Sequence, residues 1–142
     1  MSDTNGVAIS MFTYRKLGKH GSDVIAHPIM YRIIIGAMQY VTLMRPNIYF
    51  CVNKSCQFMY SPLESHWILV KRILRYLSGT ITHGLLLSHA HQLHQILVRV
   101  YSDSDWRSDS DDQRSTSNSC IYFGPNLVAW NSKKQPLVVY KS

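Results

Sequence analysis

The sequence is poor in acidic residues, in cysteine and in the two residues that most often interrupt regular structure. Among 142 residues there are eight Asp and Glu, three Cys, seven Gly and five Pro. So little glycine and proline excludes a collagen-like or Pro/Gly-rich chain. A small, odd number of cysteines argues against a disulfide scaffold and favours a reducing compartment.

A long hydrophobic run is also missing. The most apolar stretch, residues 29–44, is interrupted by Arg32 and Gln39, and it is shorter than the ~20 residues that a membrane span requires. Residues 1–16 include an acid, Asp3, and no apolar segment typical of a secretory signal. We therefore expect a soluble, intracellular chain with no membrane partner.

Signatures of several enzyme and metal-site classes are absent. The sequence has no glycine-rich phosphate loop or dinucleotide fingerprint, no serine-hydrolase elbow and no cysteine with an evident base partner. The histidines between residues 89 and 94, together with Cys51 and Cys56, lack the spacing of zinc ligands. The acids at 109–112 lack the glycine and the final glutamate of a calcium loop. We expect no bound cofactor in this chain.

The overall composition is typical of a basic, globular protein. Hydrophobic residues make up 46% and charged residues 16% of the sequence, as in a folded domain. The net charge is +7, and the excess of Lys and Arg lies in residues 1–102, because five of the eight acids fall between Asp103 and Asp112. A polyanion such as nucleic acid is therefore an expected partner.

Apolar residues recur at helical spacing from residue 28 onward and predict two successive helices. Pro28 suits the first position of the first helix, since its missing N–H would have no partner there. Arg45–Pro46 should end that helix, and Pro46 should open the second. The expected apolar stripes are Met30, Ile33, Ile34, Ala37, Val41 and Met44 in the first helix and Ile48, Val52, Ser55 and Met59 in the second.

A third helix has the clearest predicted boundaries. Ser61 and Glu64 are spaced as a capping box, in which a hydroxyl and a carboxylate satisfy two orphan amides, and Gly79 should supply a left-handed stop. The residues expected on its apolar face are Trp67, Val70, Leu74 and Leu77.

After Gly79 the pattern changes to short strand-like runs. These cover residues 84–87, 96–101, 117–123 and 127–130, with a turn at 124–126. We expect an α+β chain in which three helices precede a three-strand antiparallel meander. The expected parts are an irregular lead-in at 1–26, a helical region at 27–80, a strand and polar linker at 81–95, and a final region at 96–142.

The third helix carries a basic face formed by Lys71, Arg72 and Arg75 beside Tyr76. Lys and Arg on such a face could neutralise phosphates without reading sequence. On the charge pattern alone, an ordinary solvated helix face is the favoured interpretation.

Asp103 and Asp105 follow a strand-like run. A carboxylate at a strand end is a common Mg²⁺ ligand, because hard cations bind oxygen, and two-metal nucleases use such acids to hold both oxygens of the displaced phosphate. Without further acids to complete a site, the spacing alone favours an ordinary polar strand end.

Several motifs in consecutive order resemble copia-type retrotransposon polyproteins, from about residue 14 to the C-terminus. The matching segments in the helical region are Tyr31–Arg32, Gly36, Gln39–Tyr40, Thr42–Ile48, Gln57–Met59, Pro62, His66–Trp67 and Lys71–Thr80. The matching segments after it are Tyr101–Trp106, Asp111–Asp112, Arg114–Ser117 and Trp130–Gln135.

In that family, this stretch joins the end of the reverse transcriptase to the start of the RNase H domain. The resemblance implies that the helices are a thumb-like connection near the template–primer duplex and that residue 96 onward opens an RNase H-like domain. It implies that Asp103 matches the first metal-binding carboxylate, with Mg²⁺ as the parent family's cofactor. It also makes Lys71, Arg72 and Arg75 more credible duplex contacts.

The sequence departs from the family where catalysis is concerned. It holds no Tyr-x-Asp-Asp motif of the polymerase, and no acid follows Asp112. Asp103 is therefore expected to be a vestigial ligand, and the chain a truncated polyprotein fragment that is not an enzyme. We expect at most weak, sequence-independent binding to RNA–DNA hybrid or other nucleic acid. The alternatives are a part that becomes active when another chain completes it, and a small protein-interaction module.

Overall fold

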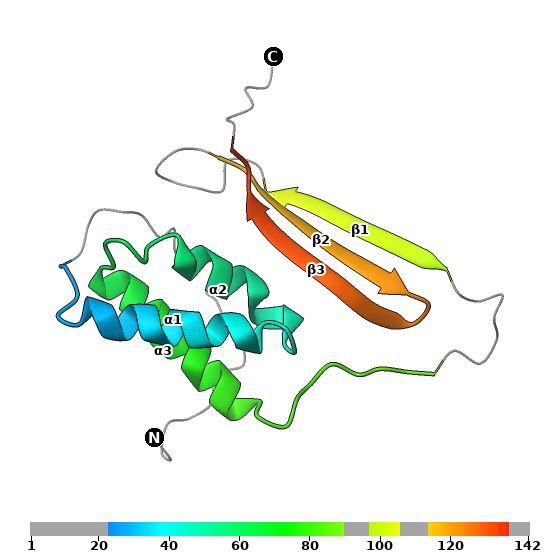
Figure 1. Ribbon diagram of the computed structural model, residues 1–142, viewed down its shortest axis with the longest axis horizontal. Coiled ribbons are helices and arrows are strands. Elements are labelled where there is room, and N and C mark those ends of the chain that lie inside the picture. Colours follow the sequence, from blue (N-terminus) through cyan, green and yellow to red (C-terminus); the bar gives the residue numbers. More distant parts are fainter. Residues whose placement is uncertain (1–22, 90–96, 106–113, 137–142) are drawn as a thin grey trace. The chain divides into compact units, whose positions relative to one another are not determined.

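The structure, a computed structural model, describes residues 23–89, 97–105 and 114–136, which belong to two compact units divided between Gly84 and Leu85. The first unit holds α1 (Pro28–Val41), the short 3₁₀ helix η1 (Pro46–Ile48), α2 (Tyr49–Cys56) and α3 (Glu64–Gly79). The second holds β1 (Val98–Asp105), β2 (Thr116–Phe123) and β3 (Asn126–Lys134), as Figure 1 shows. The predicted α+β class and the order of its elements are confirmed.

Helix α1 begins at Pro28 as predicted but buries a different side. Its buried residues are Tyr31, Ile35 and Met38, whereas most of the predicted stripe, including Met30 and Ile33, is exposed. The core-facing side therefore lies about 100° around the helix from the predicted side. Both sides of this helix are apolar, so periodicity alone could not select the buried one.

The segment from Pro46 to Cys56 largely follows the prediction. Pro46 opens a helical segment, although its first turn is 3₁₀ rather than α. Ile48, Val52 and Ser55 are buried, and Met59 lies past the end of α2 and is half-buried. Three of the four positions of the predicted stripe thus form the buried side of this segment.

Helix α3 begins two residues later than a Ser61 cap would place it, so the predicted Ser61–Glu64 capping box is wrong. Residues 23–25 pair with residues 62–64: the Glu64 amide donates to the Asp23 carbonyl over 2.9 Å, and the Ile25 amide donates to the Pro62 carbonyl over 3.3 Å. This pairing holds Leu63 in an extended conformation as the residue before the helix. The pairing also shows that the end of the expected irregular lead-in is tied to α3.

His66 takes the place of the predicted cap. Its Nδ1 accepts a hydrogen bond from the Leu63 amide over 3.0 Å, and its ring stacks on Phe58 with 3.8 Å between ring centroids. Because Nδ1 is an acceptor, the neutral ring carries its proton on Nε2. A buried histidine thus satisfies one of the amides at the start of α3.

The buried side of α3 and the backbone conformation at its end also differ from the prediction. The buried residues are His66, Leu69, Val70 and Ile73, whereas the expected core positions Trp67, Leu74 and Leu77 are half-buried at its margin. Gly79 is the last helical residue and does not adopt a left-handed conformation, since Gly124 alone among the described glycines has a positive φ. The predicted left-handed conformation of Gly79 is therefore wrong, although the helix ends at this residue as predicted.

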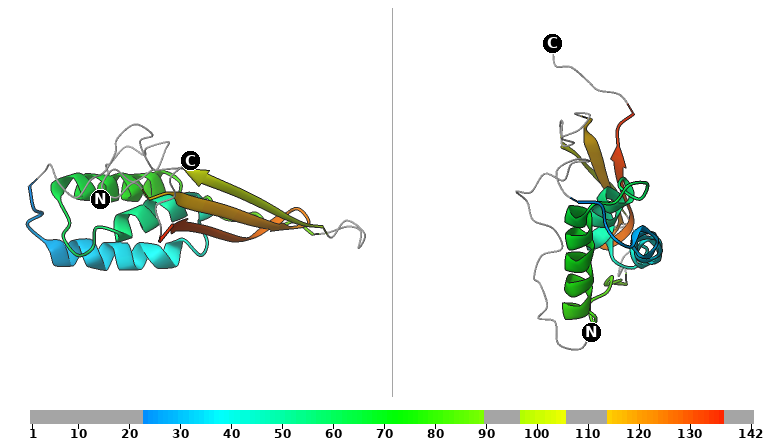
Figure 2. Two further views of the ribbon diagram at one scale, coloured as in Figure 1. Left: turned by 90° about the horizontal axis from the view of Figure 1, so that it is seen from above. Right: turned by 90° about the vertical axis from the view of Figure 1, so that its left-hand side faces the viewer.

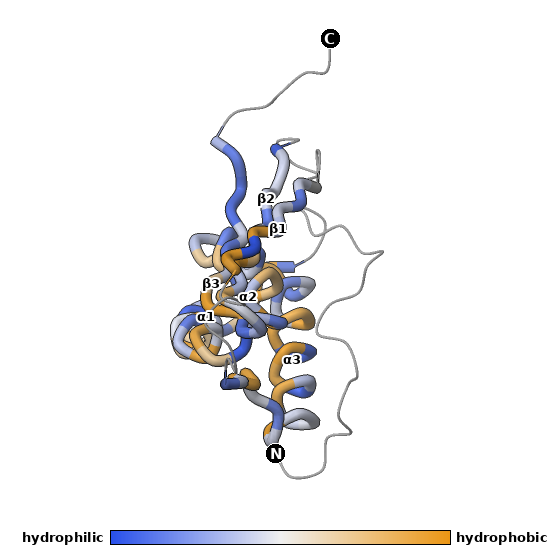
Figure 3. The backbone as a smooth tube through the Cα atoms, turned by 90° about the vertical axis from the view of Figure 1, so that its right-hand side faces the viewer, coloured by the Kyte–Doolittle hydropathy of each residue, from blue (hydrophilic) through white to orange (hydrophobic). Residues whose placement is uncertain are grey.

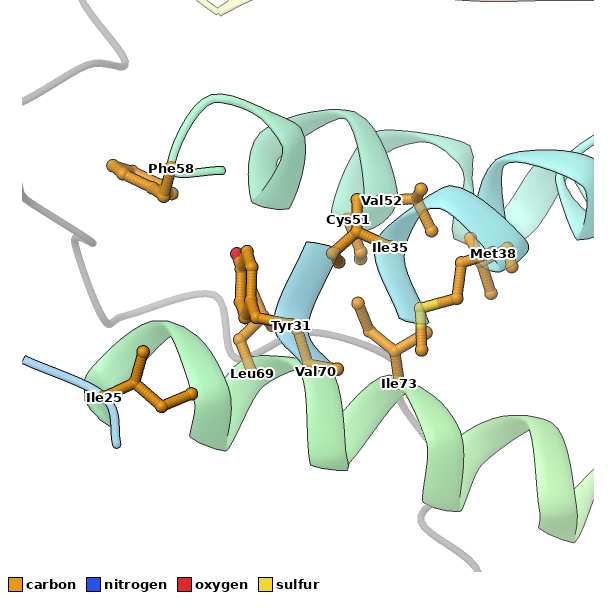
Figure 4. Packing of buried hydrophobic residues seen from close by; sticks show 11 residues of the cluster. Ile25, Tyr31, Ile35, Met38, Cys51, Val52, Phe58, Leu69, Val70 and Ile73 are labelled. Carbon is orange, nitrogen blue, oxygen red and sulfur yellow. The ribbon is translucent and has the colours of Figure 1, made fainter. Parts of the chain in front are cut away.

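The core of the helical unit lies where α1, α2 and α3 meet. Helices α1 and α3 cross rather than run parallel, as Figure 2 shows. Figure 4 shows Tyr31 and Ile35 of α1 packed toward α3, with Cys51 and Val52 of α2 above them. The fully buried cluster consists of Ile25, Tyr31, Ile35, Met38, Ile48, Cys51, Val52, Phe58, Leu69, Val70 and Ile73. No helix among the described residues is long and apolar enough to cross a membrane.

The sheet is an antiparallel meander in the order β1-β2-β3, as predicted. Strands β2 and β3 are joined by a two-residue turn in which Gly124 has a φ of 59°, a conformation that favours glycine at the first turn position. The predicted short strand at 84–87 is wrong, because these residues have no regular structure. Beyond them, Ser88 forms two backbone hydrogen bonds with the Asn126 side chain, at 2.6 and 2.9 Å.

We predict that His66→Ala lowers the free energy of unfolding of the helical unit by about 3 kcal/mol, since it removes a cap hydrogen bond and leaves a buried cavity. Chemical denaturation followed by far-UV circular dichroism measures this change. The control is Ser61→Ala, expected to change stability by less than about 0.5 kcal/mol because Ser61 is exposed outside the helix. A larger loss for Ser61→Ala than for His66→Ala would mean that Ser61 caps the helix after all.

Candidate nucleic-acid and metal-binding residues

A buried arginine closes the end of α3. Arg45 is only 8% exposed, and its Nη1 donates to the carbonyls of Thr80 and His83 over 2.9 and 3.1 Å. Its Nη2 donates to the Thr80 hydroxyl over 2.6 Å, and its guanidinium lies 5.9 Å from the centre of the Tyr76 ring. A cation here satisfies carbonyls beyond the helix end and interacts favourably with the negative end of the helix dipole.

The sequence pattern predicts Arg45 as part of a helix stop and does not predict this role. The signal that could have found it is a charged residue at the end of a mostly apolar segment, since a buried charge must be paired. The carbonyls that pair with it lie 35 and 38 residues further along the chain, so the sequence gives no indication of which groups they are.

Two neighbouring residues of α1 tie this helix to the end of α2. The Tyr31 hydroxyl donates to the Ser55 carbonyl over 2.8 Å, and burial raises the pKa of this hydroxyl above its ordinary value. Arg32 donates to the carbonyls of Met59 and Tyr60 over 2.9 and 3.3 Å. The Tyr31–Arg32 pair, which carries part of the family resemblance, is thus a structural tie.

A small pocket of about 210 Å³ lies between α1 and α2. At its edge, the Gln39 amide donates to Cys56 Sγ over 3.2 Å. Burial is the main cause that raises the pKa of the Cys56 thiol, which disfavours the reactive thiolate. The pocket is lined by Gln39, Thr42, Tyr49, Val52, Asn53 and Cys56.

The basic residues of α3 are not all equally accessible. Lys71 and Arg75 are exposed, whereas Arg72 is half-buried. Lys71 Nζ lies 5.6 Å from the centre of the Trp67 ring. Along α3 the backbone alternates between hydrophobic and hydrophilic residues in Figure 3, as an amphipathic helix should. The structure therefore presents two of the three predicted phosphate-binding side chains to solvent.

Asp103 lies on β1, at the edge of the sheet, and its side chain is exposed. In the strand register it stands opposite Asn118, which in turn stands opposite Ser132, so the three side chains share one face. Asn118 Oδ1 is buried and has no hydrogen-bond partner among the described residues. Asp103 and Asn118 together supply one carboxylate and one amide oxygen.

These ligands do not fit the pair of magnesium ions that the family resemblance implies. Two ions about 4 Å apart need several carboxylates from different elements. Within residues 23–89, 97–105 and 114–136, no three His, Cys, Asp or Glu side chains gather where they could hold a metal ion. The acids at 109–112 and the histidines at 91 and 94 lie outside these residues, and the side chain of Asp105 is likewise not described.

The sequence is similar to transposon polyproteins and to shorter proteins. It is 40% identical over 136 residues to the retrovirus-related Pol polyprotein from transposon RE2 of Arabidopsis thaliana, covering 96% of this chain and 9% of the polyprotein. It is 42% identical over 111 residues to the uncharacterized mitochondrial protein AtMg00810 of the same plant, covering 45% of that protein. It is 36% identical over 115 residues to the secreted RxLR effector protein 161 of Plasmopara viticola, covering 79% of that protein. No family model and no solved structure matches the chain.

We predict that Arg45→Met lowers the free energy of unfolding by about 3 kcal/mol, because it removes the buried guanidinium that donates to three acceptors of Thr80 and His83 just after α3. Arg45→Lys should recover only part of this loss, since an ammonium cannot reproduce the fork of the guanidinium. The measurement is urea denaturation of each variant.

The matched control for Arg45 is Arg75→Met on the exposed side of α3, where less than about 0.5 kcal/mol of change is expected. Equal losses for Arg45→Met and Arg75→Met would contradict a special role for Arg45.

Proposed function

Since this chain belongs to the family of retrovirus-related Pol polyproteins from copia-type transposons, we propose that it is the segment that joins the reverse transcriptase to the RNase H domain. It spans 9% of the RE2 polyprotein and 8% of the RE1 polyprotein. We propose that the chain binds nucleic acid without sequence preference and has no catalytic activity of its own.

The observation that carries this proposal is the continuous alignment of 96% of the chain with one short stretch of a Pol polyprotein. The division of the chain into a helical unit and a sheet unit supports it, because a junction between two domains requires such a boundary. In this proposal, the helical unit is a thumb-like connection and the meander is the opening of an RNase H-like sheet.

The exposed cations of α3 support the binding part of the proposal. Lys71 and Arg75 are exposed and separated by one helical turn, so they lie on the same side of α3. Two cations at this spacing can contact neighbouring phosphates on a nucleic-acid backbone. Such contacts do not distinguish one base sequence from another. Arg72, which is half-buried, contributes mainly to packing and less to phosphate binding.

The shortage of carboxylates supports the absence of catalysis. Asp103 is an exposed acid on an edge strand, and the neighbouring Asn118 and Ser132 are neutral. Hydrolysis by two metal ions requires carboxylates from several elements to neutralise and orient both cations. Another chain could supply the missing acids, and this alternative predicts Mg²⁺-dependent cleavage only after that chain is added.

We predict that the chain binds an RNA–DNA hybrid at low salt and that the Lys71→Ala, Arg75→Ala double variant binds more weakly. The slope of log K against log salt should become shallower by about two, one for each lost phosphate contact. Filter binding over a salt series measures both the affinity and the slope.

The control is the charge-conserving double variant Lys71→Arg, Arg75→Lys, which should keep the wild-type slope. The proposed contact of Lys71 and Arg75 with phosphates would be contradicted if the wild-type chain did not retain the hybrid at low salt. An unchanged slope for the alanine variant would also contradict it.

We predict that the purified chain does not cleave an RNA–DNA hybrid in the presence of Mg²⁺, because among the described residues Asp103 belongs to no group of three side chains that could hold a metal ion. Gel electrophoresis of a labelled RNA strand measures cleavage, with Asp103→Asn as the matched variant. Cleavage by the wild-type chain that disappears in Asp103→Asn would show that the chain is an enzyme.

A further inference from the structure

The outer side of α1 is apolar and exposed, which is unusual for a helix that also contributes to the core. Six large apolar side chains on this helix and the turn after it are at least half exposed, and they include Ile33 at 61% and Tyr40 at 77%. Between residues 28 and 44 the single charged residue is Arg32, whose guanidinium is bound to backbone carbonyls after α2. The six side chains, which we call the outer α1 face, are Ile29, Met30, Ile33, Tyr40, Leu43 and Met44.

We propose that the outer α1 face is a self-association surface, at which two copies of this chain pair through antiparallel α1 helices. An exposed apolar patch of this kind is typical of an interaction site. The occupant we infer is a second copy, for reasons of symmetry, close approach and area.

The first reason is the symmetry of the side chains along the helix. Ile29 and Met44 are equally far from the midpoint between Gly36 and Ala37, and so are Ile33 and Tyr40. When two such helices cross antiparallel at this midpoint, Ile33 of one copy meets Tyr40 of the other, and Ile29 of one copy faces the turn after α1 that holds Met44 in the other. Each contact then occurs twice, as an interface with two-fold symmetry requires.

The second reason is the glycine at the centre of the face. Gly36 lies in the interior of α1, where glycine is less favourable than alanine. A Cβ atom placed on Gly36 would meet no atom within 4 Å, so packing inside the chain does not require a glycine there. Gly36 and the exposed Ala37 remove side-chain bulk at the point where the two helices would approach most closely.

The third reason is the area of the face. A large apolar side chain presents on the order of 100 Å², so six such side chains approach the roughly 800 Å² per partner of a standard interface. The pairing would bury no charge, because Arg32 is already directed toward the carbonyls of Met59 and Tyr60. Each copy carries a net charge of +7, so added salt should screen the mutual repulsion and strengthen the dimer.

The experiment is sedimentation equilibrium of the full 142-residue chain over a range of concentration and salt. We expect a monomer–dimer equilibrium with a dissociation constant in the range of about 1–100 µM. Ile33→Asp should weaken association at least about tenfold. The matched control is Ile68→Asp, on the exposed side of α3 where the side chain is 53% exposed, and it should leave the dissociation constant unchanged.

A second variant tests whether two α1 helices approach each other closely at Gly36, independently of any effect on folding. A Cβ atom at position 36 meets open space in the monomer, so Gly36→Leu should raise the thermal stability of the monomer while it weakens the dimer. A monomer at all concentrations, an unchanged dissociation constant for Ile33→Asp or Gly36→Leu, or equal weakening by Ile68→Asp would overturn the proposal. The first of these results is also what is expected if a different segment or another protein covers the outer α1 face.

Discussion

The helical unit depends on the buried guanidinium of Arg45. This group joins the turn after α1 to the residues that follow α3, which are 35 and 38 positions away in the chain. The cost of burying its charge is offset because the charge meets two carbonyls, a hydroxyl and the negative end of a helix dipole. Pairing of residues 23–25 with residues 62–64 secures the other end of α3. Both ends of this helix are therefore held by groups that are distant in sequence.

Several residues that carry the family resemblance act as ties within this unit. Tyr31 and Arg32 bind carbonyls at and after the end of α2, and Gln39 binds the Cys56 thiol. His66 satisfies the amide that precedes α3 and stacks on Phe58. The residues of the helical region that match the family thus act mainly in the folding of this unit.

The two units differ in how completely their apolar side chains are covered. The helical unit has a fully buried cluster, yet one side of α1 remains exposed. In the sheet unit, Val98, Val100, Phe123 and Val128 are all about half exposed or more. An antiparallel sheet usually covers one of its faces with other elements. Self-association through the outer α1 face would cover part of the exposed apolar surface of the helical unit.

The sequence by itself determined the type and order of the elements, since Pro28, Pro46 and the turn at Gly124–Pro125 act through local backbone geometry. It also determined that no acid follows Asp112. Only the tertiary structure decided which side of α1 is buried, because two sides of that helix are apolar. Only it placed Arg45 against Thr80 and His83, because these residues lie 35 and 38 positions further along the chain. The error at Ser61 has the same origin, because pairing of residues 62–64 with residues 23–25 outweighed the local preference for a Ser61 cap.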